Sequence, residues 1–190
     1  RLWWQQCRPG ARTRRGGVMN AAFPPIAALL PHAPPMLLLD EVLDHGTDTI
    51  TTAVTIRCDH PFFDTVAASV PCHVGIELMA QTCGAYAGLR AQSEGRPPSL
   101  GFLLGTRKYS CTVRRFGIGD RMEVRATVVY LDGEMGVFDC RICIKAVEIA
   151  SAQLTVYQPA DVTAVPTGPV GKLQSQAENQ PRTGEHDAFI

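Results

Sequence analysis

Side chains able to transfer protons gather between residues 60 and 77 of this sequence. Two histidines, His60 and His73, precede Glu77, which is the only charged residue between positions 74 and 89. Histidine is suited to act as a base because its ordinary pKa, about 6.5, lies near neutral pH. A glutamate among apolar side chains has its charged form disfavoured, so it can stay protonated and donate a proton. These residue types predict general acid–base chemistry.

Each of these residues also has a structural interpretation. An acidic side chain near a helix start is stabilised by the helix dipole, which would explain Glu77 without catalysis. His60 could hold its loop through a hydrogen bond, and we expect His73 to pack at the start of the helix rather than act as the base. Gln81, one helical turn after Glu77, either orients that carboxyl group by hydrogen bonding or is a packed polar residue.

The other three histidines are not candidates for the base. His32 lies in the proline-rich stretch PHAPPM, where we expect it to make structural hydrogen bonds. His45 lies in an expected turn before Gly46, and His186 lies near the C-terminus.

A helix after Pro71 is expected to position Glu77. Its apolar residues recur at helical spacing, and the adjacent stripe carries polar and small residues: Ile76, Met79, Ala80, Cys83 and Ala87 in the first, and Glu77, Gln81, Gly84 and Gly88 in the second. Neither stripe is charged apart from Glu77, so the helix should be covered on most sides. Glycines weaken a helix, and they are tolerated where another backbone approaches closely. The sequence SEGRPP at 93–98 should end the helix.

Strands are expected on both sides of this helix. Residues 36–45 and 47–57 predict a hairpin, because the second run alternates and is rich in β-branched residues. From residue 101 onward the period is two, which predicts about four strands of an antiparallel meander within 101–113, 121–131, 136–149 and 151–159, with a turn at Asp132–Gly133. Helix and strands are segregated, which indicates an α+β fold. A sheet can bury so apolar a helix only by curling around it, which is the hotdog arrangement.

Composition limits the class of protein. The chain has 190 residues, 45% of them hydrophobic, which fits one domain with a sizeable core. We expect this domain at 19–158, after an upstream extension at 1–18 and before a disordered tail at 159–190. Five arginines and no acid fall within 1–18, so the rest of the chain is net acidic and is not expected to bind nucleic acid.

Cysteine usage and hydropathy predict a cytoplasmic protein. Seven cysteines, an odd and scattered set, fit a reducing compartment better than a disulfide framework. Cys140 and Cys143 form a CxxC pattern within an alternating strand, where they should face opposite sides, so we expect neither a metal site nor a redox pair. No apolar run reaches the length of about 20 residues that a membrane span needs.

Four sequence blocks carry a family resemblance. LLPHAPPMLLLDEVLDH (29–45), HPF (60–62), VPCHVGIELMAQT (70–82) and GFLLGTRKY (101–109) are similar, in this order, to blocks of hotdog-fold 3-hydroxyacyl-(acyl carrier protein) dehydratases. The similarity covers roughly residues 24–158. It is strongest to the branch associated with aryl-polyene pigment and related lipid clusters.

The resemblance implies a site and its residues. In that family a histidine from the loop before the helix faces an acidic helix residue across a dimer interface. Glu77 of IELMAQ matches the acid and His60 of HPF matches the histidine. The stretch between them is longer than in the housekeeping dehydratases, lacks their Gly-Pro pair and adds His73. Further substrate-binding residues are expected in the matched blocks: Phe62, Val74, Gly75, Gly101, Phe102 and Leu103.

The proposed chemistry requires more than a proton donor and a base. The enolate-like thioester oxygen needs hydrogen-bond donors, which the free N–H groups of the first helical turn, around Val74 and Gly75, could supply. Acyl carrier proteins are acidic, so a basic rim is a candidate docking surface, although a solvated loop explains it equally well. That rim comprises Arg107, Lys108, Arg114 and Arg115.

We therefore predict a dehydratase that acts on carrier-bound 3-hydroxyacyl thioesters without a metal or organic cofactor. We expect a homo-oligomer, at least a dimer, or a hetero-oligomer with a related hotdog subunit. Two alternatives remain open at this point. One is a hotdog acyl-thioesterase, in which a carboxylate activates water. The other is a catalytically silent subunit that binds the acyl chain.

Overall fold

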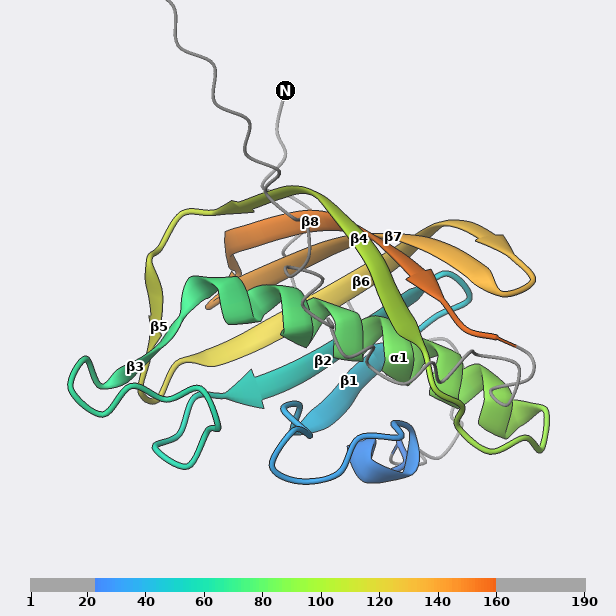
Figure 1. The fold of residues 1–190 in the computed structure, drawn as a ribbon, viewed down its shortest axis with the longest axis horizontal. Helices are drawn as coiled ribbons and strands as arrows, with labels where there is room; N and C mark the ends of the chain where they lie inside the picture. The colour runs from blue at the N-terminus through green and yellow to red at the C-terminus, as the bar shows by residue number, and fades with distance from the viewer. Residues whose placement is uncertain (1–22, 160–190) are drawn as a thin grey trace, which may run out of the picture.

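One sheet curls around one long helix in the computed structural model, which describes residues 23–159 (Figure 1). The six strands of the main sheet are ordered β1-β2-β6-β7-β8-β4, and β3 pairs with β5 in a small second sheet. The predicted extension at 1–18 and almost all of the predicted tail lie outside the described residues. The strands are β1 (Glu41–His45), β2 (Thr49–Thr55), β3 (Ser69–Pro71), β4 (Phe102–Cys111), β5 (Arg115–Gly117), β6 (Arg121–Asp132), β7 (Met135–Ile144) and β8 (Val147–Tyr157).

The helix α1 (Gly75–Ser93) follows a single 3-10 turn at Cys72–Val74 and crosses the concave side of the sheet (Figure 1). It ends where SEGRPP begins, as predicted. Leu78 and Met79 are fully buried, and a buried side chain of this size contributes about 1.5–3 kcal/mol to folding. The α+β hotdog arrangement predicted from the sequence is confirmed. Within residues 23–159, no helix is long and apolar enough to cross a membrane.

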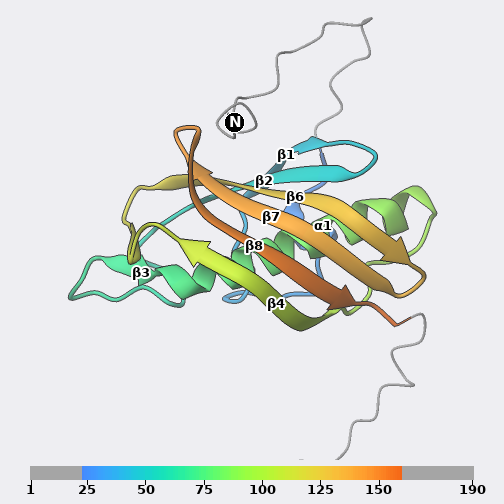
Figure 2. The ribbon, with the colours of Figure 1, turned by 90° about the horizontal axis from the view of Figure 1, so that it is seen from above.

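The sheet differs from the predicted four-strand meander in the place of β4. Only β6, β7 and β8 form a meander, whereas β4 pairs with β8 and forms the edge opposite β1 (Figure 2). Between β4 and β6 the chain leaves the main sheet, because β5 pairs with β3 at the start of the helix. Alternation in a sequence predicts strands, but it does not specify which strands are neighbours.

A strand boundary was also predicted wrongly. The alternating run at 136–149 was expected to be one strand, yet β7 ends at Ile144 and β8 begins at Val147. Lys145 and Ala146 make the turn with φ of 48° and 66°. Both residues adopt the left-handed conformation that hairpin turns require, which is normally signalled by Gly or Asn. Neither is present here, so the sequence gives no turn signal.

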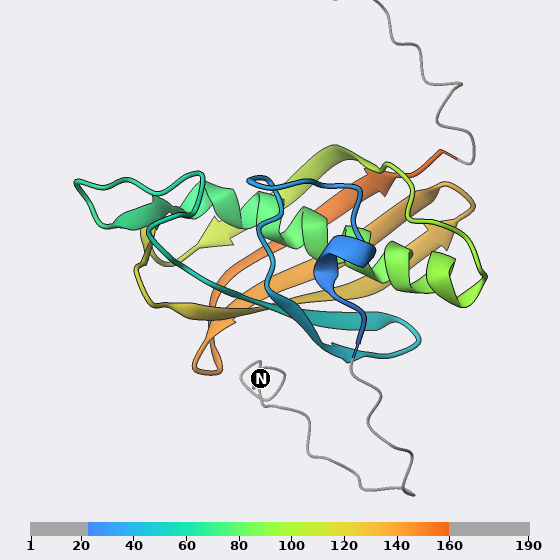
Figure 3. The same cartoon turned by 90° about the horizontal axis from the view of Figure 1, so that it is seen from below.

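The N-terminal segment, residues 26–38, lies against α1 (Figure 3), and we call it the strap. It opens with a 3-10 turn, η2 (Ile26–Ala28), and Leu29 and Leu30 are both buried. A Cβ added at Gly88 would come within 2.1 Å of the Leu29 carbonyl oxygen, and one at Gly84 would meet the Leu30 side chain at 2.8 Å. Gly88 therefore permits the backbone of Leu29 to approach the helix closely, as a glycine in the helix predicted.

Gly88→Ala should loosen this strap. The added methyl group overlaps a backbone oxygen rather than a flexible side chain, so we expect a loss of about 1–3 kcal/mol in the free energy of unfolding. Urea unfolding followed by circular dichroism measures it. Gly95→Ala is the comparison, because a Cβ there meets nothing within 4 Å, although its φ of 70° carries some backbone strain. Equal stability of Gly88→Ala and the wild type would contradict the close contact.

Candidate active site

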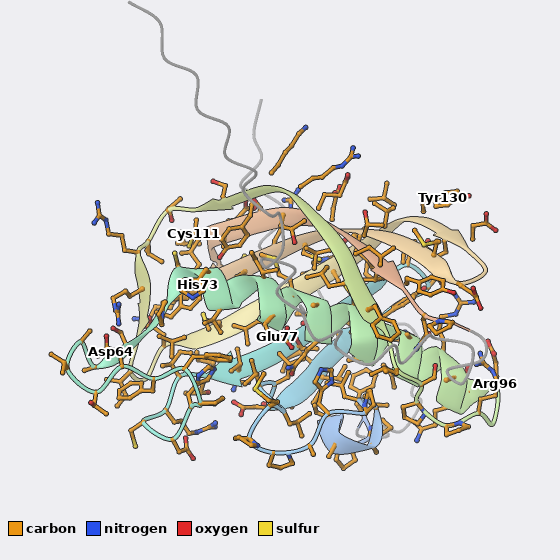
Figure 4. The ribbon with its side chains drawn as sticks, in the orientation of Figure 1. Asp64, His73, Glu77, Arg96, Cys111 and Tyr130 are labelled. Carbon is orange, nitrogen blue, oxygen red and sulfur yellow. The ribbon has the colours of Figure 1, made fainter. Side chains whose placement is uncertain are left out.

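Glu77 lies in the first turn of α1 and lines a cavity of about 260 Å³ that extends along the helix as far as Arg90. We call this cavity the Glu77 pocket. Small residues of α1, Ala80, Gly84 and Ala87, form part of its wall. Aromatic side chains from the helix and the sheet also line it: Tyr86, Phe102, Phe138 and Tyr157. Figure 4 shows Glu77 between His73, at the start of the helix, and Arg96, beyond its other end. Polar and charged side chains line the rest of the cavity, among them Arg90, Glu94, Arg96 and Glu134.

The Glu77 carboxyl group is held by two neighbours. Gln81 donates a hydrogen bond from Nε2 to Glu77 Oε1 over 2.8 Å. His32 Nε2 lies 3.8 Å from the same oxygen. The Glu77 side chain is 35% exposed, so this chain alone removes it only partly from solvent. The desolvation expected from its apolar sequence neighbours is therefore incomplete, because those neighbours on α1 point to other sides of the helix.

Gln81 joins the helix to the strap. Its Oε1 accepts a hydrogen bond from the Leu38 N–H over 3.0 Å, and its Nε2 also donates to the Met36 carbonyl oxygen over 2.8 Å. The residue is 1% exposed. The predicted hydrogen bond to Glu77 is present, and the two bonds to the strap were not foreseen. One buried amide thus fixes both Glu77 and the backbone on which His32 is carried.

His32 is the residue that sequence reasoning missed. It was expected to make structural hydrogen bonds, but it lines the Glu77 pocket and faces Glu77. Its Nδ1 is buried without a hydrogen-bond partner among residues 23–159. The positions lie 45 residues apart in the numbering, so no local periodicity connects them. The available signals were the glycines at 84 and 88, which indicated that a backbone crosses the helix.

His60 lies in the loop after β2 and is not among the residues that line the Glu77 pocket. Its Nδ1 accepts a hydrogen bond from the Phe62 N–H over 3.2 Å, and its Nε2 is buried with no partner in the described part of the chain. Burial lowers the pKa of His60, and the nearby Asp59 opposes this shift. The loop hydrogen bond is the one that the structural interpretation expected, and the role of His60 as the base stays a prediction.

The lowered pKa of His60 leads to a stability prediction. A histidine that folding makes harder to protonate costs stability once the pH falls below its unfolded pKa, about 6.5. The free energy of unfolding of the wild type should therefore fall more steeply from about pH 7 to pH 5 than that of His60→Gln. Urea unfolding at several pH values measures both slopes. Parallel slopes would show that His60 titrates alike in the folded and unfolded states.

The other predicted substrate-binding residues divide into two groups. Gly101, Phe102 and Leu103 line the Glu77 pocket, together with Glu77 itself. His73, Val74 and Gly75 do not, and neither does Phe62. His73 is exposed, whereas a Cβ at Gly75 would meet the Tyr109 hydroxyl group at 2.7 Å. The predicted oxyanion donors around Val74 and Gly75 are thus buried among core residues, and that role stays a prediction.

None of the predicted docking residues lines the pocket. Arg107, Lys108 and Arg114 are exposed on and after β4, and Arg115 forms an ion pair with Asp64 and donates to the Ser69 hydroxyl group over 2.7 Å. Arg115 therefore has a structural role between β5 and the loop before β3. The basic side chains in the pocket lining are instead Arg90 and Arg96.

The two cysteines of the CxxC pattern on β7 are not paired with each other: the sulfur close to Cys140 belongs to Cys83. Cys140 Sγ lies 3.7 Å from Cys83 Sγ on α1, and burial raises the pKa of the Cys83 thiol. Cys140 and Cys143 are both buried, and the register shifts at a bulge between Ile142 and Cys143. Cys140 nevertheless pairs with the buried Ala126 of β6 and Cys143 with the exposed Glu123, so the two cysteines face opposite sides of the sheet, as predicted.

Known proteins resemble this chain in sequence and in fold. The family model described as "ApeP-like: ApeP dehydratase" matches residues 24–167. The 3-hydroxyacyl-[acyl-carrier-protein] dehydratase FabZ of Streptococcus pneumoniae strain Hungary19A-6 is 30% identical over 133 residues, which cover 68% of this chain and 92% of that protein. FabZ of Streptococcus pyogenes serotype M1 is likewise 30% identical over 133 residues, covering 68% of this chain and 93% of that protein.

Two solved structures agree with the fold. The dehydratase heterocomplex ApeI:P from Xenorhabdus doucetiae superposes with a TM-score of 0.71 at 29% identity, covering 74% of this chain and 94% of that one. The HP0420-homologue from Helicobacter felis has a TM-score of 0.51 at 11% identity, covering 69% and 98%, and shows the fold alone. The family model spans the whole described domain, including Glu77 and the strap, and the chain therefore belongs to the ApeP-like dehydratase family.

Proposed function

We propose that this chain is a hydro-lyase that converts a 3-hydroxyacyl thioester, carried on acyl carrier protein, into the trans-2-enoyl thioester and water. The observation that carries the proposal is Glu77, held by Gln81 at one end of a long pocket with aromatic walls. Membership of the dehydratase family supports the same reaction. The pocket supplies both a proton-transferring group and room for an acyl chain.

Glu77 is proposed as the general acid. The C3–O bond breaks as the oxygen takes a proton from the Glu77 carboxyl group, so that water leaves instead of hydroxide. A base accepts the C2 proton, and the electron pair of the C2–H bond becomes the second bond between C2 and C3. General acid–base assistance of this kind typically accelerates a reaction by about 10²–10⁴-fold. Gln81 holds the carboxyl group in one orientation, which keeps its proton directed into the pocket.

A second hotdog subunit is proposed to cover the open side of this site. The helix face around Glu77 is only half-buried, and Leu103 and Leu104 of β4 are 42% and 57% exposed. Covering this face would close the pocket around the substrate and exclude water from Glu77. The ApeI:P structure is a heterocomplex, which supports a related subunit as well as a second copy. In either assembly, His60 of the covering subunit remains a candidate for the base.

Other parts of the proposal come from the sequence. We propose that the acidic carrier protein docks on the exposed Arg107, Lys108 and Arg114. Ion pairs between these basic side chains and the carrier would stabilise the complex. Reaction without a metal or organic cofactor, and a cytoplasmic location, stay predictions.

An assay with three readouts tests the proposal. The full chain is given a 3-hydroxyacyl thioester and, separately, an enoyl thioester on acyl carrier protein. The dehydratase interconverts them, which is followed by the ultraviolet absorbance of the conjugated enoyl thioester. Release of free thiol without interconversion would identify a thioesterase instead. Binding without turnover would identify a silent acyl-binding subunit.

A further inference from the structure

We propose that Tyr109 of β4 is a positioning residue for Glu77. Its hydroxyl group holds the turn from which α1 starts, and the position of this turn decides where the Glu77 carboxyl group meets the substrate. The inference rests on the proposed function and deepens it, because it adds to the reaction a residue that acts through the backbone of the helix start rather than on the substrate itself.

A hydrogen bond joins Tyr109 to the start of the helix. The Tyr109 hydroxyl group donates to the carbonyl oxygen of Cys72, the first residue of the 3-10 turn that leads into α1. The Gly75 N–H donates to the same oxygen from the other end of this turn. A carbonyl oxygen has two lone pairs and can accept both bonds. Because Glu77 lies in the first turn of α1, a displacement of the 3-10 turn would displace Glu77 as well.

A bulge in β4 directs Tyr109 toward the helix. The register between β4 and β8 shifts between Arg107 and Ser110, where β4 accommodates one extra residue. Within this stretch Lys108 has a φ of 53°, a left-handed value that is uncommon outside glycine. In strict alternation Tyr109 would share the face of the exposed Arg107, but the extra residue turns it to the opposite face, toward Gly75. Bulges often re-aim a side chain next to an active site.

Gly75 leaves the space that the Tyr109 hydroxyl group occupies. A Cβ at Gly75 would lie 2.7 Å from the Tyr109 hydroxyl oxygen, 3.1 Å from a methyl carbon of Ile142 and 3.4 Å from the ring of Phe116. The φ of Gly75 is −55°, an ordinary helical value, so the backbone conformation does not require a glycine here. The missing side chain therefore serves the contact between β4 and the helix start.

Tyr109 remains a hydrogen-bond donor throughout the pH range of an assay. Burial raises the pKa of Tyr109 above its ordinary value of about 10, and the neighbouring thiols of Cys111 and Cys72 raise it further. The phenol group thus keeps its proton at neutral pH and does not titrate with the reaction. Its removal should lower the rate by the same factor at about pH 6 and about pH 8, whereas the loss of a titrating acid or base would depend on pH.

Glu77 is then held from two directions. Gln81 binds the carboxyl group itself, and Tyr109 fixes the backbone turn that precedes it. A proton donor must lie close to the oxygen that it protonates, and a displacement of about 1 Å can cost about 10²-fold in rate. Losing one of the two supports should therefore slow the chemical step while leaving the binding of the acyl chain nearly unchanged.

Tyr109→Phe tests the inference in the full chain, in the oligomeric form in which it purifies. We expect kcat to fall by about 10–100-fold, with KM changed by less than about threefold. The control is Thr112→Val, which also takes a hydroxyl donor from a backbone carbonyl oxygen, that of Ile149, and leaves this oxygen the Thr112 N–H. Its kcat and KM should stay within about threefold of the wild type. Circular dichroism establishes that each variant is folded.

Gly75→Ala provides a second measurement through a double-mutant cycle. In the wild type the added methyl group overlaps the Tyr109 hydroxyl group, and we expect kcat to fall by about 10–100-fold. In the Tyr109→Phe background the hydroxyl group is absent, so adding Gly75→Ala should lower kcat by less than about threefold more. A general loss of folding stability would instead make the effects of the two substitutions multiply.

The outcomes separate this inference from the proposed function. If the wild type interconverts the two thioesters and a folded Tyr109→Phe keeps its kcat within about threefold, only the inference fails. A loss that appears in KM alone, or that differs between about pH 6 and about pH 8, also overturns the role of Tyr109 in positioning. If the folded wild type binds the thioester without interconverting it, the proposed function fails, and the inference fails with it.

Discussion

Glu77→Gln should abolish dehydration and leave the fold intact. The amide keeps nearly the same shape and still accepts a hydrogen bond from Gln81 Nε2, but it cannot give up a proton to the leaving hydroxyl group. We expect kcat to fall by about 10²–10⁴-fold, the usual contribution of a positioned general acid. Because the side chain is 35% exposed, the free energy of unfolding should change by less than about 1 kcal/mol. Enoyl thioester absorbance and urea unfolding measure the two effects.

A matched variant controls for the change in charge. Glu123→Gln on β6 alters an exposed carboxylate outside the Glu77 pocket and should keep the rate of the wild type. A Glu77→Gln protein that turns over within about threefold of the wild type would show that Glu77 only stabilises the start of the helix.

Gln81→Leu should be the most destabilising single change near the site. The substitution removes three hydrogen bonds and leaves the Leu38 N–H and the Met36 carbonyl oxygen without their partner. The Leu38 N–H is buried, and a buried backbone group left unpaired costs about 1–3 kcal/mol; with the two part-buried hydrogen bonds also lost, we expect a loss of about 2–5 kcal/mol in the free energy of unfolding. Activity should fall too, because Glu77 loses its orienting amide and the strap its anchor.

Urea unfolding of Gln81→Leu is compared with that of Gln92→Leu, which changes an exposed glutamine of the same helix. The second variant should differ from the wild type by less than about 0.5 kcal/mol. Equal stability of the two variants would contradict the hydrogen bonds that Gln81 makes to the strap.

Local sequence patterns predicted the helix of this site, but they did not predict which distant segments contact it. The buried helix follows from apolar residues at helical spacing, and the hydrogen bond from Gln81 to Glu77 follows from a separation of one turn. The contact between His32 and Glu77 joins segments that no periodicity relates. The strap was expected only as a proline-rich entrance to the domain. Its path across α1 depends on Gly88: the glycine predicted that some backbone approaches the helix, but it did not predict that this is the backbone of Leu29.

The sheet shows the same division between local and distant relationships. Alternation predicted the inward side chains of β6, where Met122, Val124 and Ala126 are buried. It did not predict that β4 pairs with β8 at the edge of the sheet. The position of β4 depends on the path of the chain through β5, which leaves the main sheet. The non-glycine turn at Lys145–Ala146 carried no sequence signal. The Glu77 side chain is 35% exposed in a single chain. Its exposed side is the one that we propose a second subunit covers.

The destination of a water oxygen tests the central claim most directly. The full chain is incubated with an enoyl thioester on acyl carrier protein in water enriched in heavy oxygen, and the products are examined by mass spectrometry. A dehydratase running in reverse places the heavy oxygen on C3, so the label appears in an intact 3-hydroxyacyl thioester, and Glu77→Gln should prevent this. Label found instead in a released carboxylic acid, with the thioester unlabelled, would contradict the account.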